Sequence, residues 1–252
     1  MKTIHLVLQG KGGVGKSVVA SMLCQYILAK GMTLTAFDTD PVNQSLVAME
    51  SLKAIRLNIR TKDDDINRRI FDQLMDAIIN EPDGDRQFVI DNGSGSFLPL
   101  CAWMRENQTI DMWQEMGVRV LLHSVVTGGQ GQDDTLDGLE VLMTYFKAPI
   151  VAWLNSFLGE IEYTSATTGK TLGFEDFDLY KKNSGRFMAL IRIPLKSPQT
   201  FGKDLEELFK RHQTFDEAQT DDALPIMVKQ RLKLFWKEMC QEIDNAGVIE
   251  TA

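Results

Sequence analysis

A glycine-rich segment with two lysines lies near the start of the chain. Residues Gly10 to Ser17 match the pattern G-x-x-x-x-G-K-[ST] of a phosphate-binding loop. Glycines in such a loop let backbone N–H groups turn inward around phosphate oxygens, because no Cβ atom interferes. A helix that begins near Ser17 would point its positive end at the same anion. The pattern therefore predicts a nucleotide phosphate site.

Each position of the loop has an expected role. We expect Lys16 to reach the outer phosphates and to act in catalysis, and the Ser17 hydroxyl to bind Mg²⁺. The residues expected to bind the nucleotide are Gly10, Lys11, Gly12, Gly13, Val14, Gly15, Lys16, Ser17 and Val18. The alternative is a glycine-rich turn with an incidental lysine. The position of the match between an expected strand and an expected helix favours the phosphate loop.

Three aspartates follow expected strands and could complete this site. Asp38 and Asp40 end one strand, and Asp91 ends another. Because the carboxyl ends of parallel strands face the ligand crevice, all three carboxylates could approach the loop. One could bind Mg²⁺ through water while another orients the attacking water, since phosphoryl transfer depends on positioning and charge stabilisation. The alternative for the first two is a turn-forming pair before Pro41.

The elements that must position these residues alternate along the chain. Short apolar runs rich in β-branched residues alternate with segments of helical period, which predicts βαβ units and a mainly parallel sheet. Strands are expected at residues 4–8, 34–37, 88–90, 118–126, 149–154 and 188–193, and helices at 17–30, 66–79, 136–146, 201–211 and 224–243. We expect one domain over residues 1–252. The polar segment 159–186, with a turn at Thr168-Gly169, is expected to be an insertion.

The segment Lys11 to Ser17 resembles the deviant Walker A motif of the ParA/MinD ATPase superfamily. This resemblance implies the three-layer P-loop NTPase fold, with helices on both faces of a twisted sheet. It also implies a homodimer with ATP between the subunits, in which Lys11 reaches the phosphates of the partner and acts in catalysis.

The same resemblance suggests roles for the aspartates. Asp38 matches the aspartate after strand two, and Asp40 matches the switch I residue that places the hydrolytic water. Asp91 matches the Walker B carboxylate, so that Ser17, Asp38 and Asp91 are the expected metal ligands. The chain departs from the family pattern because no proline follows Asp91 closely; Asn92-Gly93 stands there instead. A hairpin turn at Asn92-Gly93 is disfavoured, since no alternating strand follows.

The bound base is expected to be adenine. The Asn-Lys-x-Asp motif that reads guanine in GTPases does not occur in the sequence. Asn155 matches a position that often binds adenine in ParA-like proteins, and Pro194 follows the last strand near the expected base. ATP and Mg²⁺ are therefore the predicted cofactors.

Over nearly its whole length the chain is similar to the TraL proteins of plasmid conjugation regions, which are ParA-like. The resemblance implies a role in conjugative transfer or plasmid maintenance, with a conjugation or partition protein as partner. The matching segments are 7–9, 38–43, 90–93, 114–117, 125–130, 153–155, 214–218 and 230–233.

Composition sets limits on the remaining functions. The net charge of −8 disfavours a protein that coats nucleic acid, although a basic patch at Lys229, Arg231, Lys233 and Lys237 could contact DNA nonspecifically. Three widely spaced cysteines favour a reducing cytoplasm. No run approaches the roughly 18 apolar residues of a membrane span, so no membrane insertion is expected.

We expect a slow ATPase that switches between nucleotide states. Two alternatives stay open. One is a small-molecule ligase or kinase on the same fold, of the dethiobiotin-synthetase type, and the other is a nucleotide-binding scaffold that does not hydrolyse.

Overall fold

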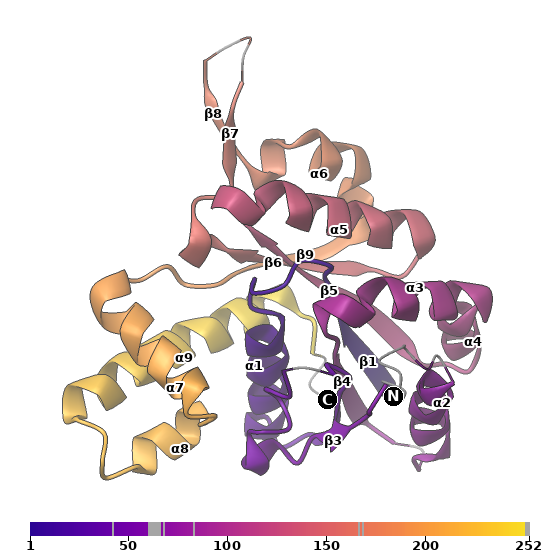
Figure 1. The fold of residues 1–252 in the computed structure, drawn as a ribbon, viewed down its shortest axis with the longest axis horizontal. Helices are drawn as coiled ribbons and strands as arrows, with labels where there is room; N and C mark the ends of the chain where they lie inside the picture. Colours follow the sequence, from indigo (N-terminus) through magenta and orange to yellow (C-terminus); the bar gives the residue numbers. More distant parts are fainter. Residues whose placement is uncertain are drawn as a thin grey trace.

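In a computed structural model of the chain, a parallel sheet lies between two layers of helices (Figure 1). The structure describes residues 1–41, 43–59, 67, 69–82, 84–165, 167 and 169–249. Within these residues, seven strands form this sheet in the order β3-β2-β4-β1-β5-β6-β9, and every neighbouring pair is parallel. The strands are β1 (Lys2–Val7), β2 (Thr33–Asp38), β3 (Ile55–Arg56), β4 (Arg86–Asp91), β5 (Arg119–Thr127), β6 (Ile150–Asn155) and β9 (Phe187–Arg192).

Each face of the sheet has its own hydrophobic core, because strand side chains alternate between faces. In β1, for example, Ile4 and Leu6 belong to one core and Val7 to the other. One core packs under α2 (Ile70–Asn80), α3 (Phe97–Glu106), α4 (Thr109–Glu115), α5 (Gln132–Tyr145) and α6 (Asp178–Asn183). The other packs under α1 (Lys16–Ala29), α7 (Lys203–Lys210), α8 (Phe215–Thr220) and α9 (Ile226–Ala246). The predicted α/β class and the three layers are thus confirmed.

The predicted elements are present, with shifts at their ends. Each expected strand agrees with an observed one to within a few residues. The helix expected over 66–79 begins at Ile70, and residue 66 lies outside the described residues. The helix α1 ends before Gly31, whose φ of 72° only glycine adopts readily.

The segment 159–186 contains an antiparallel hairpin that the sequence did not predict. Its strands are β7 (Glu162–Thr164) and β8 (Thr171–Gly173), and α6 follows them. Figure 1 shows this hairpin projecting beyond α5 and α6. The turn expected at Thr168-Gly169 falls partly outside the described residues; Gly169 itself has a φ of 66°.

Besides α6, the described residues contain three further helices that were not predicted: α3, α4 and α8. Helix α8 has a recognisable signal, because Thr214 and Glu217 form a capping box in which each side chain binds the backbone N–H of the other residue. None of the described helices is both long enough and apolar enough to span a membrane.

Candidate functional site

The phosphate loop joins β1 to α1 at the carboxyl edge of the sheet. Gly13 and Gly15 have φ values of 75° and 102°, which a residue with a side chain rarely adopts. The Val19 N–H donates to the Gly15 carbonyl (2.9 Å), so helical hydrogen bonding begins at the loop. A Cβ atom at Gly10 would lie 3.1 Å from the ring of Phe97, which packs under the loop. The glycines are therefore required for backbone conformation and for close packing.

Lys16 is buried at the start of α1. Its Nζ donates to the Lys11 carbonyl of the same loop at 2.7 Å. Burial lowers the pKa of Lys16, while the nearby carboxylates of Asp91 and Asp40 raise it. Lys16, Asp40 and Asp91 are therefore close enough to interact, as the sequence predicted for one site.

Asp91, at the end of β4, is buried without a hydrogen-bond donor. Neither carboxylate oxygen accepts a hydrogen bond from any described residue. Burial raises the pKa of Asp91 to about 7; the Ser17 hydroxyl and the Lys16 ammonium lower it, although Ser17 does not reach hydrogen-bond geometry. A buried carboxylate without partners is costly for a folded protein, so it points to a ligand that would satisfy it.

These residues fit a magnesium ion. Mg²⁺ in nucleotide sites binds one or two protein oxygens, and phosphates and water supply the rest. Asp91 and the Ser17 hydroxyl provide such oxygens next to the phosphate loop. The described residues contain no group of three His, Cys, Asp or Glu side chains that could hold a metal alone.

Asp38 differs from Asp91 because backbone groups already bind its oxygens. Oδ1 accepts from the Asp40 N–H (3.0 Å), and Oδ2 accepts from the N–H groups of Leu46 (3.1 Å) and Val47 (3.3 Å). Burial raises the pKa of Asp38, and these three N–H groups lower it. Asp38 thus organises the loop after β2, and its predicted metal contact would have to use its remaining lone pairs.

Asp40 lies against the segment that follows Asp91. A Cβ atom at Gly93 would be 2.7 Å from the Asp40 Cγ, so a larger residue there would displace the Asp40 carboxylate. The Asp40 Oδ1 accepts from the Asn43 N–H at 3.0 Å. The end of β4 and the loop after β2 therefore pack directly on each other at this point.

Asn92 takes the place expected for the missing proline and fixes the backbone by hydrogen bonds. Its Oδ1 accepts from the hydroxyls of Thr39 (2.9 Å) and Ser96 (2.8 Å), and its amide donates to the Gly93 carbonyl (3.1 Å). Residues 94–96 form a 3₁₀ turn that leads into α3, so the disfavoured hairpin turn is absent at this point. Asn92 links the ends of β2 and β4.

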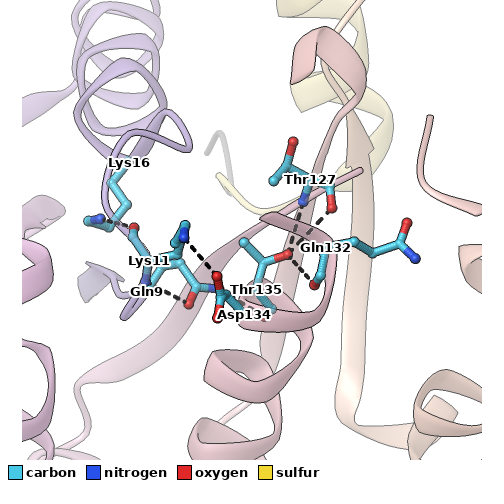
Figure 2. A network of polar contacts seen from close by, with 7 residues as sticks. All are labelled: Gln9, Lys11, Lys16, Thr127, Gln132, Asp134 and Thr135. Atoms are coloured by element: carbon cyan, nitrogen blue, oxygen red, sulfur yellow. Dashed lines mark hydrogen bonds and ion pairs between the residues drawn. The ribbon is translucent and has the colours of Figure 1, made fainter. Parts of the chain in front are cut away.

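Lys11 extends toward α5 at the surface. Its Nζ forms an ion pair with Asp134 at 2.7 Å, and the two side chains are 42% and 55% exposed (Figure 2). Behind it, the buried Gln9 donates to the Thr135 carbonyl at 2.9 Å. Gly138 in α5 must lack a Cβ atom, since one would lie 1.9 Å from the Gln9 Oε1. The loop is thereby fastened to the first turn of α5.

Of the two predicted base contacts, Asn155 lies in the cavity beside the loop, whereas Pro194 does not line that cavity. A cavity of about 350 Å³ extends from Gly13–Gly15 past Asn155 and Ile193. The Asn155 amide donates to the Val14 carbonyl (2.9 Å), and its oxygen accepts from the Phe157 N–H (3.2 Å). Asn155 therefore braces the phosphate loop at the cavity wall. Pro194 lines the adjoining cavity of about 570 Å³.

The basic residues of α9 do not form one group. Arg231 pairs with Asp204 of α7 and is partly buried. Lys229, Lys233 and Lys237 form no ion pair with the described residues. A basic surface on this helix therefore consists of the three lysines without Arg231.

Sequence reasoning missed several residues that shape this site. Gln9 and Asp134 hold the loop, and Phe97 packs beneath it. Gln9 does have a signal, since it is a polar residue directly after the apolar run of β1. Asp134 has none, because its partner Lys11 is 123 residues away in the sequence.

Comparison with known proteins defines the class. The family model of the CobQ/CobB/MinD/ParA nucleotide binding domain matches residues 5–229. The chain belongs to this family, and the segment Gly10 to Ser17 lies within the matched residues.

Within the family, similar full-length relatives are TraL proteins. One protein TraL of Escherichia coli is 43% identical over 251 residues, which are 99% of this chain and 100% of that protein. A second protein TraL of Escherichia coli is 41% identical over 251 residues, again 99% of this chain and 100% of that protein. The predicted TraL-type, ParA/MinD-like relationship is thus confirmed.

The fold is also similar to that of a solved structure. The MinD cell division protein of Aquifex aeolicus superposes with a TM-score of 0.53, at 14% sequence identity. The match covers 96% of this chain and 97% of that protein. At this identity the comparison supports the fold alone.

Proposed function

We propose that the chain is a Mg²⁺-dependent ATPase switch, which binds ATP, dimerises around it and relaxes after slow hydrolysis. The observation that carries the proposal is Asp91, a buried carboxylate without donors beside Lys16 and Ser17 of the phosphate loop. A structural role leaves this carboxylate unexplained, whereas a metal–phosphate ligand would satisfy it.

In this proposal, different residues bind the phosphates, hold the metal and orient the attacking water. Backbone N–H groups of the loop bind the phosphates, and Lys16 exchanges the Lys11 carbonyl for a phosphate oxygen. Ser17 and Asp91 hold the metal, which when bound neutralises negative charge on the phosphates. Asp40, which lies against Gly93, orients the attacking water.

Adenine is the base that we propose for the cavity beside Asn155. Most of its lining side chains are apolar, including Val18, Met22 and Phe157. Such walls suit the faces of a purine ring. The absence of a guanine-reading Asn-Lys-x-Asp motif from the sequence supports ATP over GTP.

A nucleotide-bridged homodimer follows from Lys11. Because this lysine is half exposed and its ion pair with Asp134 is a surface pair, it can exchange partners at little cost. We propose that it crosses to the phosphates of a second copy, as its resemblance to the deviant Walker A lysine implies.

The proposed biological setting is plasmid conjugation or maintenance, in the cytoplasm. Full-length similarity to TraL proteins supports it. The chain would act as one nucleotide-binding domain with the insertion at 159–186. A conjugation or partition protein is the proposed partner, and Lys229, Lys233 and Lys237 could contact DNA nonspecifically.

Sedimentation of the purified protein with ADP, ATP or a nonhydrolysable ATP analogue, each with Mg²⁺, tests the switch. We expect a dimer only with the triphosphates, and we expect the Lys11→Ala variant to bind nucleotide but stay monomeric. A wild-type protein that binds no ATP in the presence of Mg²⁺ would contradict the proposal.

Turnover separates the proposal from its two alternatives. We expect slow phosphate release that Asp40→Ala abolishes. Unchanged turnover in Asp40→Ala would favour a non-hydrolysing scaffold. Turnover that requires a small carbon substrate would favour a ligase or kinase.

A further inference from the structure

The β7–β8 hairpin presents exposed side chains away from both cores. Glu162, Tyr163 and Thr164 are all exposed, Tyr163 to 42%. The Tyr163 ring contacts Phe177 edge-on, with 5.2 Å between centroids, and its other surface faces outward. Two-stranded hairpins are marginally stable alone. No residue of β7 or β8 belongs to either hydrophobic core, so the exposed part of the Tyr163 ring is available to a partner.

The root of the hairpin is fixed to the first turn of α5. Gln132 pairs with Glu162 twice: its Nε2 donates to the Glu162 carbonyl and its Oε1 accepts from the Glu162 N–H, both at 3.1 Å. A Cβ atom at Gly128 would lie 2.0 Å from the Glu160 carbonyl oxygen, and one at Gly129 would lie 2.4 Å from that of Leu158. Backbone thus packs directly on backbone, and the root must move together with α5.

The same turn of α5 holds the phosphate loop on its other side. Asp134 forms the ion pair with Lys11, and the Thr135 carbonyl accepts from Gln9. The Thr135 hydroxyl accepts from the Thr127 N–H at 3.2 Å, which fixes the turn to the end of β5 (Figure 2). Four consecutive residues, 132–135, therefore connect Lys11 to the hairpin.

This geometry identifies the partner of the hairpin as a second copy of the chain. If Lys11 leaves Asp134 to reach a second copy, that copy approaches the face of the molecule on which Lys11 and Asp134 lie. Gln132 is two residues away, and it holds the hairpin root. Leu158, which is 54% exposed and lines the base cavity, lies against Gly129 at the same rim. Leu158 and Tyr163 are apolar side chains that a protein partner would bury.

We propose that the β7–β8 hairpin is a dimer arm. It packs against the second copy when Lys11 crosses to that copy, and the first turn of α5 couples the two contacts. The inference rests on the proposed nucleotide-bridged dimer and adds a contact that the phosphate loop does not provide.

Two variants test the arm, each with a matched control. Tyr163→Ser removes the exposed ring, and Tyr145→Ser removes a ring of similar exposure (38%) outside the hairpin. Gln132→Ala releases the root, and Gln114→Ala removes an exposed glutamine of α4. In sedimentation with Mg²⁺ and a nonhydrolysable ATP analogue, we expect each arm variant to weaken the dimer by about tenfold. The controls should stay within about twofold of wild type, and ADP affinity should be unchanged in all four.

Hydrogen exchange of the wild-type protein gives a readout that does not depend on variants. The analogue should protect amides of the two strands, residues 162–164 and 171–173, and Lys11→Ala should abolish that protection while still binding nucleotide. A wild-type dimer without protection in this segment, or arm variants that dimerise like wild type, would overturn the arm. A wild-type protein that binds the analogue and stays monomeric would instead overturn the proposed dimer, and the arm with it.

Discussion

Two sets of buried polar groups lie on neighbouring strands of the sheet, and they differ in how well they are satisfied. At the carboxyl edge, Asp91 is buried with no hydrogen-bond donor among the described residues. Four residues earlier on the same strand, Gln87 begins a hydrogen-bonded chain that crosses the middle of the sheet. The chain continues through His5 of β1 and His123 of β5 to Trp153 of β6, and both histidines are fully buried.

The donor and acceptor types of these side chains fix the position of each proton in the hydrogen-bonded series from Gln87 to Trp153. The Trp153 indole can only donate, so the Nδ1 of His123, at 2.9 Å, must accept. His123 then carries its proton on Nε2 and donates to the Nδ1 of His5 (2.9 Å), which donates from Nε2 to the Gln87 oxygen (3.0 Å). Both rings are therefore neutral. Burial lowers the pKa of His5 to about 4 and that of His123 well below its usual range.

The difference separates a structural network from a ligand site. Where each donor meets an acceptor, burial stabilises one arrangement and needs no further group. Where a carboxylate is buried beside a lysine without hydrogen bonds, the fold carries a cost that protonation or a bound ligand removes. Substitutions in the two regions should therefore have opposite consequences.

The largest effect is expected at Asp91. Asp91→Asn should reduce the affinity for ATP with Mg²⁺ by roughly a hundredfold, because it removes the charge that the metal needs. Its free energy of unfolding at pH 8 should stay equal or rise, since a buried charge is lost. Calorimetric titration and urea unfolding measure the two quantities.

Asp38→Asn is the matched control for that substitution. Because Asp38 accepts three backbone N–H groups, this variant should destabilise the protein by about 1–2 kcal/mol. A loss of stability in Asp91→Asn as large as in Asp38→Asn would remove the distinction between the two carboxylates.

Acid should destabilise the protein through the histidine chain. The pKa of His5 is about 4 in the folded state, below its ordinary value of 6.5, so the unfolded state binds more protons between these two values. The contribution of His5 is therefore fully present above pH 6.5 and is lost as pH falls to 4, by about 3 kcal/mol. Urea unfolding of wild type and His5→Gln should be compared from pH 8 to pH 4. Asp91 titrates in both proteins, so the difference between their free energies of unfolding isolates the contribution of His5. Parallel pH curves for the two proteins would contradict this assignment.

Removing the donor at the end of the chain should cost less. Trp153→Phe keeps most of the buried ring but leaves the Nδ1 of His123 without a donor. We expect the free energy of unfolding to fall by about 1–3 kcal/mol at pH 8. Phe146→Leu, a buried aromatic substitution outside the chain, controls for packing. If Trp153→Phe and Phe146→Leu show the same pH dependence of unfolding, the titration of the two histidines does not depend on the hydrogen bond from Trp153.

The smallest effect on stability is expected at Asp134. Asp134→Asn breaks an exposed ion pair with Lys11 and should lower the free energy of unfolding by less than about 1 kcal/mol. The same variant should shift nucleotide-dependent dimerisation, because it frees Lys11. Thermal unfolding measures the stability of the variant, and sedimentation measures its dimerisation. A loss of stability as large as that of a core substitution would contradict the prediction.

Much of the site could be predicted because its signals are local. The phosphate loop is one continuous pattern between a strand and a helix. Asp38 and Asp91 each end a strand, and Asp40 follows Asp38 by two residues. The parallel topology then brings these ends to one edge. The hairpin in 159–186 was missed because its strands are three residues each, too short for a periodic signal.

The sequence by itself determined the family, the alternation of strands and helices that builds the main sheet, and the phosphate loop with the aspartates near it. Only the tertiary structure decided that Asp91 lacks donors while Asp38 has three, and that Lys11 rests on Asp134. It also decided that Gln132 joins the loop region to the hairpin. The reason is physical: patterns along a chain report local conformation and burial, whereas hydrogen-bond satisfaction depends on which distant groups the packed elements bring within about 3 Å of each other.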